Sequence, residues 1–194
     1  MEIQGLKIAF CPGVYRPAED SFMLLDYAST YFKKGIRLLE PCTGTGLISL
    51  AAASAKCFSV ATDVDVKAVL CANRNSRENR LDGYVDFVCC DGLAAMRKNL
   101  VSTTLVVFNP PYLPGDEDPR WGGGITGVET SIKILKHCME VAPCAKIVFV
   151  ASSVSDIGRL TAFLENNGAR YRVTGRRYMG FFEELIVIEA VFTG

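Results

Sequence analysis

Several features that would mark particular protein classes are missing from this 194-residue chain. It has a single histidine, His137, and none of its eight cysteines forms a C-x-x-C pair, so the spacing typical of zinc ligands is absent. Most of the cysteines stand in apolar segments, and we expect them to be small core residues with reduced thiols. His137 falls in a helical pattern and is interpreted as structural. The sequence therefore predicts no metal site.

The chain also lacks a long apolar run and an excess of either charge. No uncharged apolar stretch reaches about 18 residues, so no membrane span is predicted, and the first residues show no signal-peptide pattern. Lys+Arg and Asp+Glu balance at 21 each, whereas a nucleic-acid enzyme usually carries a basic stripe. The arginines within 170–177 are interpreted as a solvated edge, and the acidic run Asp116-Glu117-Asp118 would repel a phosphate backbone. We expect a cytoplasmic protein, with the nucleus as a second option.

Apolar residues are abundant: they make up 49% of the chain, and the mean hydropathy is +0.22. The length suits one core, so we expect a single domain over 1–194, with 1–34 as an N-terminal helical or lid segment packed on it. The apolar excess has two interpretations that the composition leaves open. It could fill this core, or it could form a face that another protein covers.

Strand and helix patterns alternate along the chain, which predicts a doubly wound α/β sheet that is mostly parallel. Two consecutive strands at the end predict an antiparallel finish. The expected strands span 36–40, 58–63, 84–90, 104–108, 146–151, 171–176 and 184–192. One helix is expected to begin at Pro17. Five further helices are expected over 47–55, 65–78, 93–98, 128–142 and 156–167.

The most informative motif is Asn109-Pro110-Pro111-Tyr112, which follows the apolar run 104–108. Two prolines end any strand or helix, and the first keeps Asn109 extended. An amide side chain is therefore held at a strand end, beside an aromatic ring, on a stiff backbone. This arrangement suits binding of a flat group that contains nitrogen.

Polar residues also end the three strands that precede this motif. Ligands in such sheets bind beyond the carboxyl ends of the strands. Glu40 leads into a turn of small residues that includes Gly44 and Gly46, which lets the backbone approach a ligand. Asp63 is placed to accept both hydroxyls of a ribose, and Asp91 to accept from an adenine amino group. A pyrophosphate would be repelled by Glu40, whereas an amine or sulfonium would be attracted, which favours S-adenosylmethionine over NAD.

This ordered set resembles the class I S-adenosylmethionine-dependent methyltransferases, and N-P-P-Y resembles those that methylate planar nitrogens. The segment 14–22, Val-Tyr-Arg-Pro-Ala-Glu-Asp-Ser-Phe, narrows the resemblance to the eukaryotic and archaeal HemK-like release-factor glutamine methyltransferases. The glycine-rich stretch from Trp121 to Gly127 resembles the loop that follows N-P-P-Y in that group. The resemblance implies a Rossmann-like, seven-stranded fold and methyl transfer to the glutamine of a Gly-Gly-Gln loop in a translation termination factor.

The resemblance also implies roles for individual residues. Asn109, Pro110 and Tyr112 would be catalytic and, with Pro111 and Trp121, would bind the substrate. The residues expected at the cofactor, S-adenosylmethionine or its product S-adenosylhomocysteine, are Tyr15, Ser21, Glu40, Cys42, Gly44, Gly46, Asp63, Asp91 and Asn109. There are two departures from the family pattern: Cys42 replaces a usual glycine and Arg16 a common acid. The N-terminal helical domain of the bacterial relatives is not expected here.

The resemblance further implies a small zinc-binding activator subunit that forms a heterodimer with this chain. In the class I strand order the third strand, Tyr84 to Cys90, lies at the sheet edge, where unpaired backbone groups could receive a partner. The alternative is an edge covered by the chain's own loops. Alternative functions are adenine-N6 methylation of DNA or RNA, protein-lysine methylation, and a non-catalytic cofactor-binding scaffold.

Overall fold

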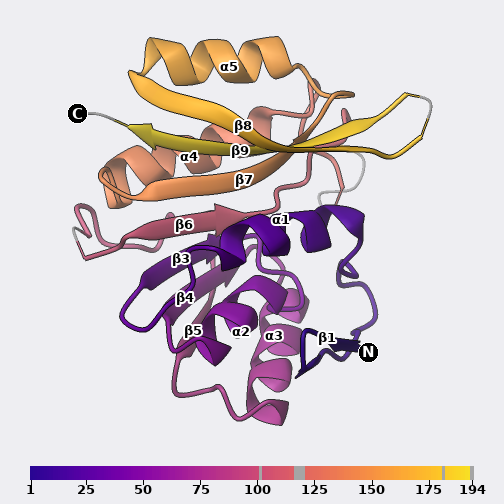
Figure 1. Cartoon of the computed structure of the whole chain (residues 1–194), viewed down its shortest axis with the longest axis vertical. Helices are drawn as coiled ribbons and strands as arrows, with labels where there is room; N and C mark the ends of the chain where they lie inside the picture. The colour runs from indigo at the N-terminus through magenta and orange to yellow at the C-terminus, as the bar shows by residue number, and fades with distance from the viewer. Residues whose placement is uncertain (101, 116–120, 181, 193–194) are drawn as a thin grey trace.

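A computed structural model describes residues 1–100, 102–115, 121–180 and 182–192, and its centre is a seven-stranded sheet (Figure 1). The strand order is β5-β4-β3-β6-β7-β9-β8, and β9 runs in the direction opposite to the other six strands. The predicted doubly wound, mostly parallel fold is confirmed. The sheet strands are β3 Arg37–Pro41, β4 Phe58–Asp63, β5 Val85–Cys89, β6 Leu105–Phe108, β7 Lys146–Ser152, β8 Ala169–Tyr178 and β9 Glu184–Phe192.

Helices cover both faces of the sheet, which explains why the central strands are apolar throughout. On β6, Leu105 and Val107 pack with α1 (Glu19–Ser29) and α2 (Leu47–Ser54), whereas Val106 and Phe108 pack with α4 (Glu129–Val141) and α5 (Ile157–Asn166). All four β6 side chains are at most 2% exposed. A strand buried on both faces cannot alternate apolar with polar residues. No described helix is long and apolar enough to cross a bilayer.

The N-terminal segment, whose contacts the sequence did not predict, folds back over α3 (Val66–Glu78). It begins with a small hairpin, β1 (Glu2–Ile3) and β2 (Leu6–Lys7). Asn75 of α3 is fully buried; its amide accepts from Ala9 N at 2.9 Å and donates to Ala9 O at 3.1 Å and Thr45 O at 2.9 Å. Asn75 thus joins the N-terminal segment to the glycine turn that follows β3.

Two sequence-based expectations are wrong. Cys11 and Cys71 form a disulfide, with Cα atoms 6.0 Å apart, because the N-terminal segment lies along α3. Sequence spacing could not show that contact across 60 residues. The helix expected near 93–98 is a series of turns instead, since positive-φ residues at Gly92 and Asn99 bracket a stretch too short for a stable helix. His137 is structural as expected: its Nδ1 accepts from Leu93 N at 3.1 Å.

Smaller differences concern element bounds. The first helix begins at Glu19 after an N-cap at Ala18, so Pro17 precedes the helix. The last hairpin is longer than expected because β8 runs from Ala169 to Tyr178. Its arginines pair with acids, as a solvated edge should: Arg172 with Glu189 at 3.2 Å and Arg176 with Glu184 at 2.7 Å.

Asn75→Ala should unfold the N-terminal segment from α3. It leaves two carbonyls and one N–H of the backbone without partners, so we expect a loss of about 3 kcal/mol in the free energy of unfolding. Asn79→Ala is the matched control: Asn79 makes similar contacts with Lys7 in an exposed position, and its loss should cost under about 1 kcal/mol. Urea denaturation with the disulfide intact measures both, and equal losses would contradict the linking role of Asn75.

Candidate functional site

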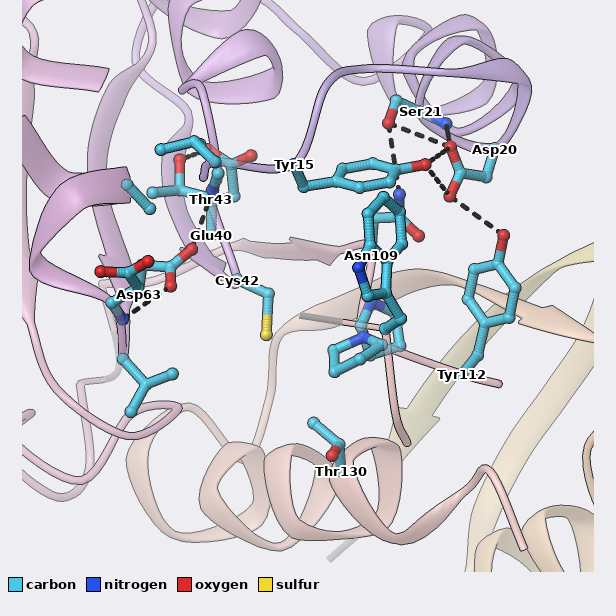
Figure 2. Close-up of a pocket in the computed structure, with 18 of the residues that line it drawn as sticks. Tyr15, Asp20, Ser21, Glu40, Cys42, Thr43, Asp63, Asn109, Tyr112 and Thr130 are labelled. Atoms are coloured by element: carbon cyan, nitrogen blue, oxygen red, sulfur yellow. Dashed lines mark hydrogen bonds between the residues drawn. The ribbon is translucent and has the colours of Figure 1, made fainter. Parts of the chain in front are cut away.

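A cavity of about 440 Å³ opens at the carboxyl ends of β3, β4 and β6 (Figure 2). The glycine turn after β3 forms one side, and the N-P-P-Y backbone forms the other. Residues of the segment from Gly13 to Ser21 and of α4 complete the lining. This is the place where the parallel-sheet rule predicts a ligand.

Glu40, at the end of β3, is 3% exposed. Its Oε2 accepts from Thr43 Oγ1 at 2.8 Å and from Ser49 N at 3.0 Å, so the carboxylate faces the first turn of α2. Burial raises the pKa of Glu40 to about 8, although the bonds from Ser49 and Thr43 oppose the shift. A nearby positive charge would therefore change the protonation of Glu40 near neutral pH.

The turn after Glu40 places small residues against the cavity. Cys42 has φ +61°, the left-handed conformation that favours glycine, which explains why glycine is usual at this position in the resembled family. Burial and the neighbouring carboxylates raise the pKa of its thiol, so it stays protonated. Gly44 lines the cavity as predicted. Gly46 is not among the lining residues: a Cβ there would lie 3.0 Å from the Cβ of Ala72, so this glycine packs closely against α3.

Asp63 and Asp91 lie at the cavity but in different environments. Asp63, at the end of β4, accepts from Gly44 N at 2.9 Å and from Asp65 N at 3.0 Å, which holds the glycine turn against β4. Burial raises the pKa of Asp63. Asp91, beyond the end of β5, is exposed and forms an ion pair at 2.9 Å with Lys133 of α4. Sequence reasoning missed Lys133, which comes from a helix 42 residues further along the chain.

The N-P-P-Y residues converge on the opposite side of the cavity. Asn109 Nδ2 donates to Ser21 Oγ at 3.3 Å, while Asn109 Oδ1 is buried and has no hydrogen-bond partner among the described residues. Pro110 is buried, and the Tyr112 carbonyl accepts from Ser155 Oγ at 2.5 Å. The amide is therefore held on a stiff backbone, as the motif predicted, and its oxygen is free to accept a hydrogen bond from a ligand.

The glycine-rich stretch packs directly on this backbone. A Cβ at Gly123 would lie 2.6 Å from the Pro111 carbonyl oxygen, and one at Gly127 would lie 2.5 Å from that of Tyr112. Only glycine fits such approaches. Trp121 lines the cavity and packs edge-on against Tyr15, with ring centroids 4.9 Å apart. The expected acidic run at 116–118 lies outside the described residues.

Asp20 is the functional-site candidate that sequence reasoning missed. Figure 2 shows it accepting from Tyr15, Ser21 and Tyr112. Asp20 is 4% exposed. Its carboxylate accepts hydrogen bonds from the Tyr15 hydroxyl at 2.7 Å and from the Tyr112 hydroxyl at 3.1 Å. Burial and the Asp20 charge raise the pKa values of both tyrosines, so both hydroxyls stay protonated. Asp20 belongs to the 14–22 segment that carries the family resemblance, and that segment was the signal that could have identified it.

The cavity suits a cationic ligand with polar ends. Its lining includes six acids, Asp20, Glu40, Asp63, Asp65, Asp91 and Glu183, and among the described lining residues Lys133 is the only base. S-adenosylmethionine, with its amine and sulfonium, fits this charge distribution. No group of three or more metal-ligating side chains occurs among the described residues.

Comparisons with known proteins agree with this chemistry. Residues 20–120 match the model of the methyltransferase small domain family. A Methanocaldococcus jannaschii protein, provisionally named protein N5-glutamine methyltransferase, is 30% identical over 98% of both chains. The mouse methyltransferase HEMK2 is 35% identical over 60% of both.

A similar solved structure is that of the E. cuniculi Mtq2–Trm112 complex, described as responsible for methylation of the eRF1 translation termination factor. It has a TM-score of 0.76 and 24% identity, and the match covers 93% of this chain and 99% of that one. At this identity the match shows the shared fold.

If the cationic amine of S-adenosylmethionine binds beside Glu40, cofactor binding at neutral pH should release a proton from Glu40. A cation stabilises the ionised carboxylate and so lowers a pKa that lies near 8 in the free protein. The affinity for S-adenosylmethionine should therefore rise with pH and level off above about pH 8. Calorimetry in two buffers of different ionisation enthalpy counts the protons. Glu40→Gln should release none and show a flat pH profile; proton counts equal to wild type in that variant would contradict the assignment.

Proposed function

Because the chain belongs to the methyltransferase small domain family and to its HemK-like protein-glutamine N5-methyltransferases, we propose that its substrate is a peptide release factor. The methyl group passes from S-adenosylmethionine to the side-chain amide of the glutamine in a Gly-Gly-Gln loop. The E. cuniculi protein of the same fold is described as acting on a termination factor, which supports this substrate. Such a substrate would place the enzyme in the cytoplasm.

The observation that carries the proposal is the unpartnered Oδ1 of Asn109. A buried acceptor without a partner costs about 1–3 kcal/mol unless a ligand satisfies it. A primary amide offers two N–H donors and a flat face, so it can satisfy Asn109 while packing beside Tyr112. A lysine ammonium offers donors but no plane.

In the proposed mechanism the chain acts by orientation and by fixed dipoles. When bound, S-adenosylmethionine supplies an electrophilic methyl group on a cationic sulfur. Asn109 Oδ1 and the Pro110 carbonyl accept from the two N–H groups of the substrate amide, which raises the electron density on its nitrogen. Tyr112 packs against the amide plane, with Pro111 and Trp121 beside it. The amide proton that is lost on methylation leaves to solvent.

The remaining cavity residues are assigned to the cofactor. Glu40 would bind its amine, Asp63 the two ribose hydroxyls, and Asp91 the adenine amino group, with Lys133 holding Asp91 in place. Tyr15, Ser21, Cys42 and Gly44 would line the same pocket. The segment from Gly13 to Ser21, which lies within the N-terminal residues 1–34, would act as the lid. Residues 1–34 would pack on the rest of the chain as part of a single domain.

Asn109→Ala should reduce methyl transfer to a purified release factor by at least about 1,000-fold, because it removes the acceptor that orients the amide. Cofactor affinity should change by less than about threefold. Transfer of tritiated methyl measures the first and calorimetry the second. A release factor with Gln→Ala in its Gly-Gly-Gln loop, and a DNA duplex, are the control substrates; label on either would contradict a glutamine substrate.

We also propose that a small zinc-binding activator covers the β5 edge. The E. cuniculi protein of the same fold forms a complex with Trm112, which supports a partner subunit. On this side of the molecule β5 ends the sheet. Two large apolar side chains four residues apart on α3, the helix beside β5, are exposed: Val66 and Leu70, at 54% and 65%. We call these two residues the edge patch. Exposed apolar clusters of this kind mark contact surfaces.

The double substitution Val66→Ser, Leu70→Ser should abolish complex formation with the activator and improve the solubility of the isolated chain, since it removes apolar area from the edge patch. Val173→Ser, on the opposite edge strand β8, is the matched control and should change neither property. Co-purification with the activator and size-exclusion chromatography measure the outcomes. Full association of the double variant would locate the partner elsewhere.

A further inference from the structure

We infer that Asp20 is a positioning residue for the methyl transfer, acting through Ser21 to keep the amide oxygen of Asn109 directed at the substrate. This inference rests on the proposed function and adds to it a reason for the orientation of Asn109. The two ends of an asparagine amide are nearly equal in size and opposite in hydrogen bonding. Packing alone therefore does not choose between them.

The contacts form a continuous chain from Asp20 to Asn109. Asp20 Oδ1 accepts from Ser21 N at 2.6 Å and from Ser21 Oγ at 3.1 Å, and Ser21 Oγ in turn accepts from Asn109 Nδ2 at 3.3 Å. Asp20 and Ser21 are 4% and 7% exposed, so water does not compete for these bonds. Asp20 also holds Tyr112, so one carboxylate governs two residues of the N-P-P-Y motif.

The donor and acceptor in each hydrogen bond follow from which groups carry a proton. An ionised carboxylate only accepts, and a serine hydroxyl has one proton. The bond from Ser21 to a carboxylate is charge-assisted and stronger than one to an amide oxygen, so the Ser21 proton points to Asp20. Ser21 Oγ can then only accept a hydrogen bond from Asn109, so Asn109 must donate through its NH2 group. Asn109 Oδ1 is left on the other side, where it has no described partner.

We call the hydrogen bonds from Asn109 to Ser21 and from Ser21 to Asp20 the relay. Without the relay, Asn109 could rotate by half a turn about its last side-chain bond. Its NH2 group would then face the NH2 group of the substrate, and two donors would meet. The amide would lose its acceptor while the shape of the cavity stayed the same. The expected loss therefore falls on kcat, with KM for the release factor near its wild-type value.

Asp20→Asn is the sharpest variant because it keeps the shape and can donate to Ser21 Oγ, which reverses the relay. We expect kcat for the release factor to fall by about 30-fold, with KM within about threefold. Ser21→Ala should produce a similar fall, and Ser21→Thr, which keeps the hydroxyl, should restore most of it. Asp26→Asn, an exposed acid of the same helix, is the matched control and should behave as wild type.

A double-mutant cycle separates positioning from general damage to the fold. Because Asp20 also holds Tyr112, the cycle is measured in a Tyr112→Phe background. If Asp20 acts on Asn109 through Ser21, Asp20→Asn combined with Ser21→Ala should there be no slower than Ser21→Ala alone. Multiplied losses, or a fall in kcat matched by loss of thermal stability, would overturn the inference. An inactive wild-type enzyme would instead refute the proposed substrate.

A second measurement does not depend on activity. In protein with 15N-labelled asparagine, the Asn109 side-chain NH2 signals, assigned by their absence in Asn109→Ala, should shift in Asp20→Asn and Ser21→Ala. They should stay near their wild-type positions in Ser21→Thr and Asp26→Asn. Unchanged signals in Asp20→Asn would overturn the relay even if the substrate were a different one.

Discussion

The burial of β6 is the constraint on which the site depends. Its four residues, Leu105–Phe108, contact a helical layer on each face and lie between β3 and β7, so the strand has no freedom to shift. The prolines that follow give this rigidity to Asn109, whose backbone leaves the sheet in a fixed direction. The glycine-rich stretch then packs on the carbonyl groups of Pro111 and Tyr112 at distances that exclude any side chain. A rigid strand thus supports an amide that must be placed to within a fraction of an ångström.

Two buried carboxylates divide the cavity into two chemical halves. Glu40 is held by α2 and the turn before it, and its raised pKa shows that its charge is not fully compensated in the free protein. Asp20 differs because four donor groups surround it, from Tyr15, Tyr112 and Ser21. The first carboxylate is suited to receive a cation. The second is already satisfied and is suited to hold other residues in place.

The sequence predicted those parts of the site that depend on chain direction and local stiffness. Glu40, Asp63 and Asn109 each end a parallel strand, and strand ends meet at one edge of the sheet. Asp20, Lys133 and the Cys11–Cys71 pair were not predicted because each acts through a contact between distant segments. Asp20 stands in the 14–22 segment that carries the family resemblance, but that segment gave it no role, and only the folded structure brings Tyr112 to it across 92 residues. Gly46, which the sequence assigned to the cofactor, is not among the lining residues of the cavity and packs against α3.

The edge patch lies near β5, whereas the substrate amide is assigned to the end of β6, so a partner on that edge need not touch the methyl acceptor. The structure nevertheless connects the two. The position that a Cβ of Gly46 would occupy lies 3.5 Å from the ring of Phe87 on β5 and 3.0 Å from Ala72 on α3. Gly46 begins α2, whose first turn donates to Glu40. Support for β5 and α3 therefore also supports the turn that forms the cofactor half of the cavity, which gives an activator a physical route to the site through packing alone.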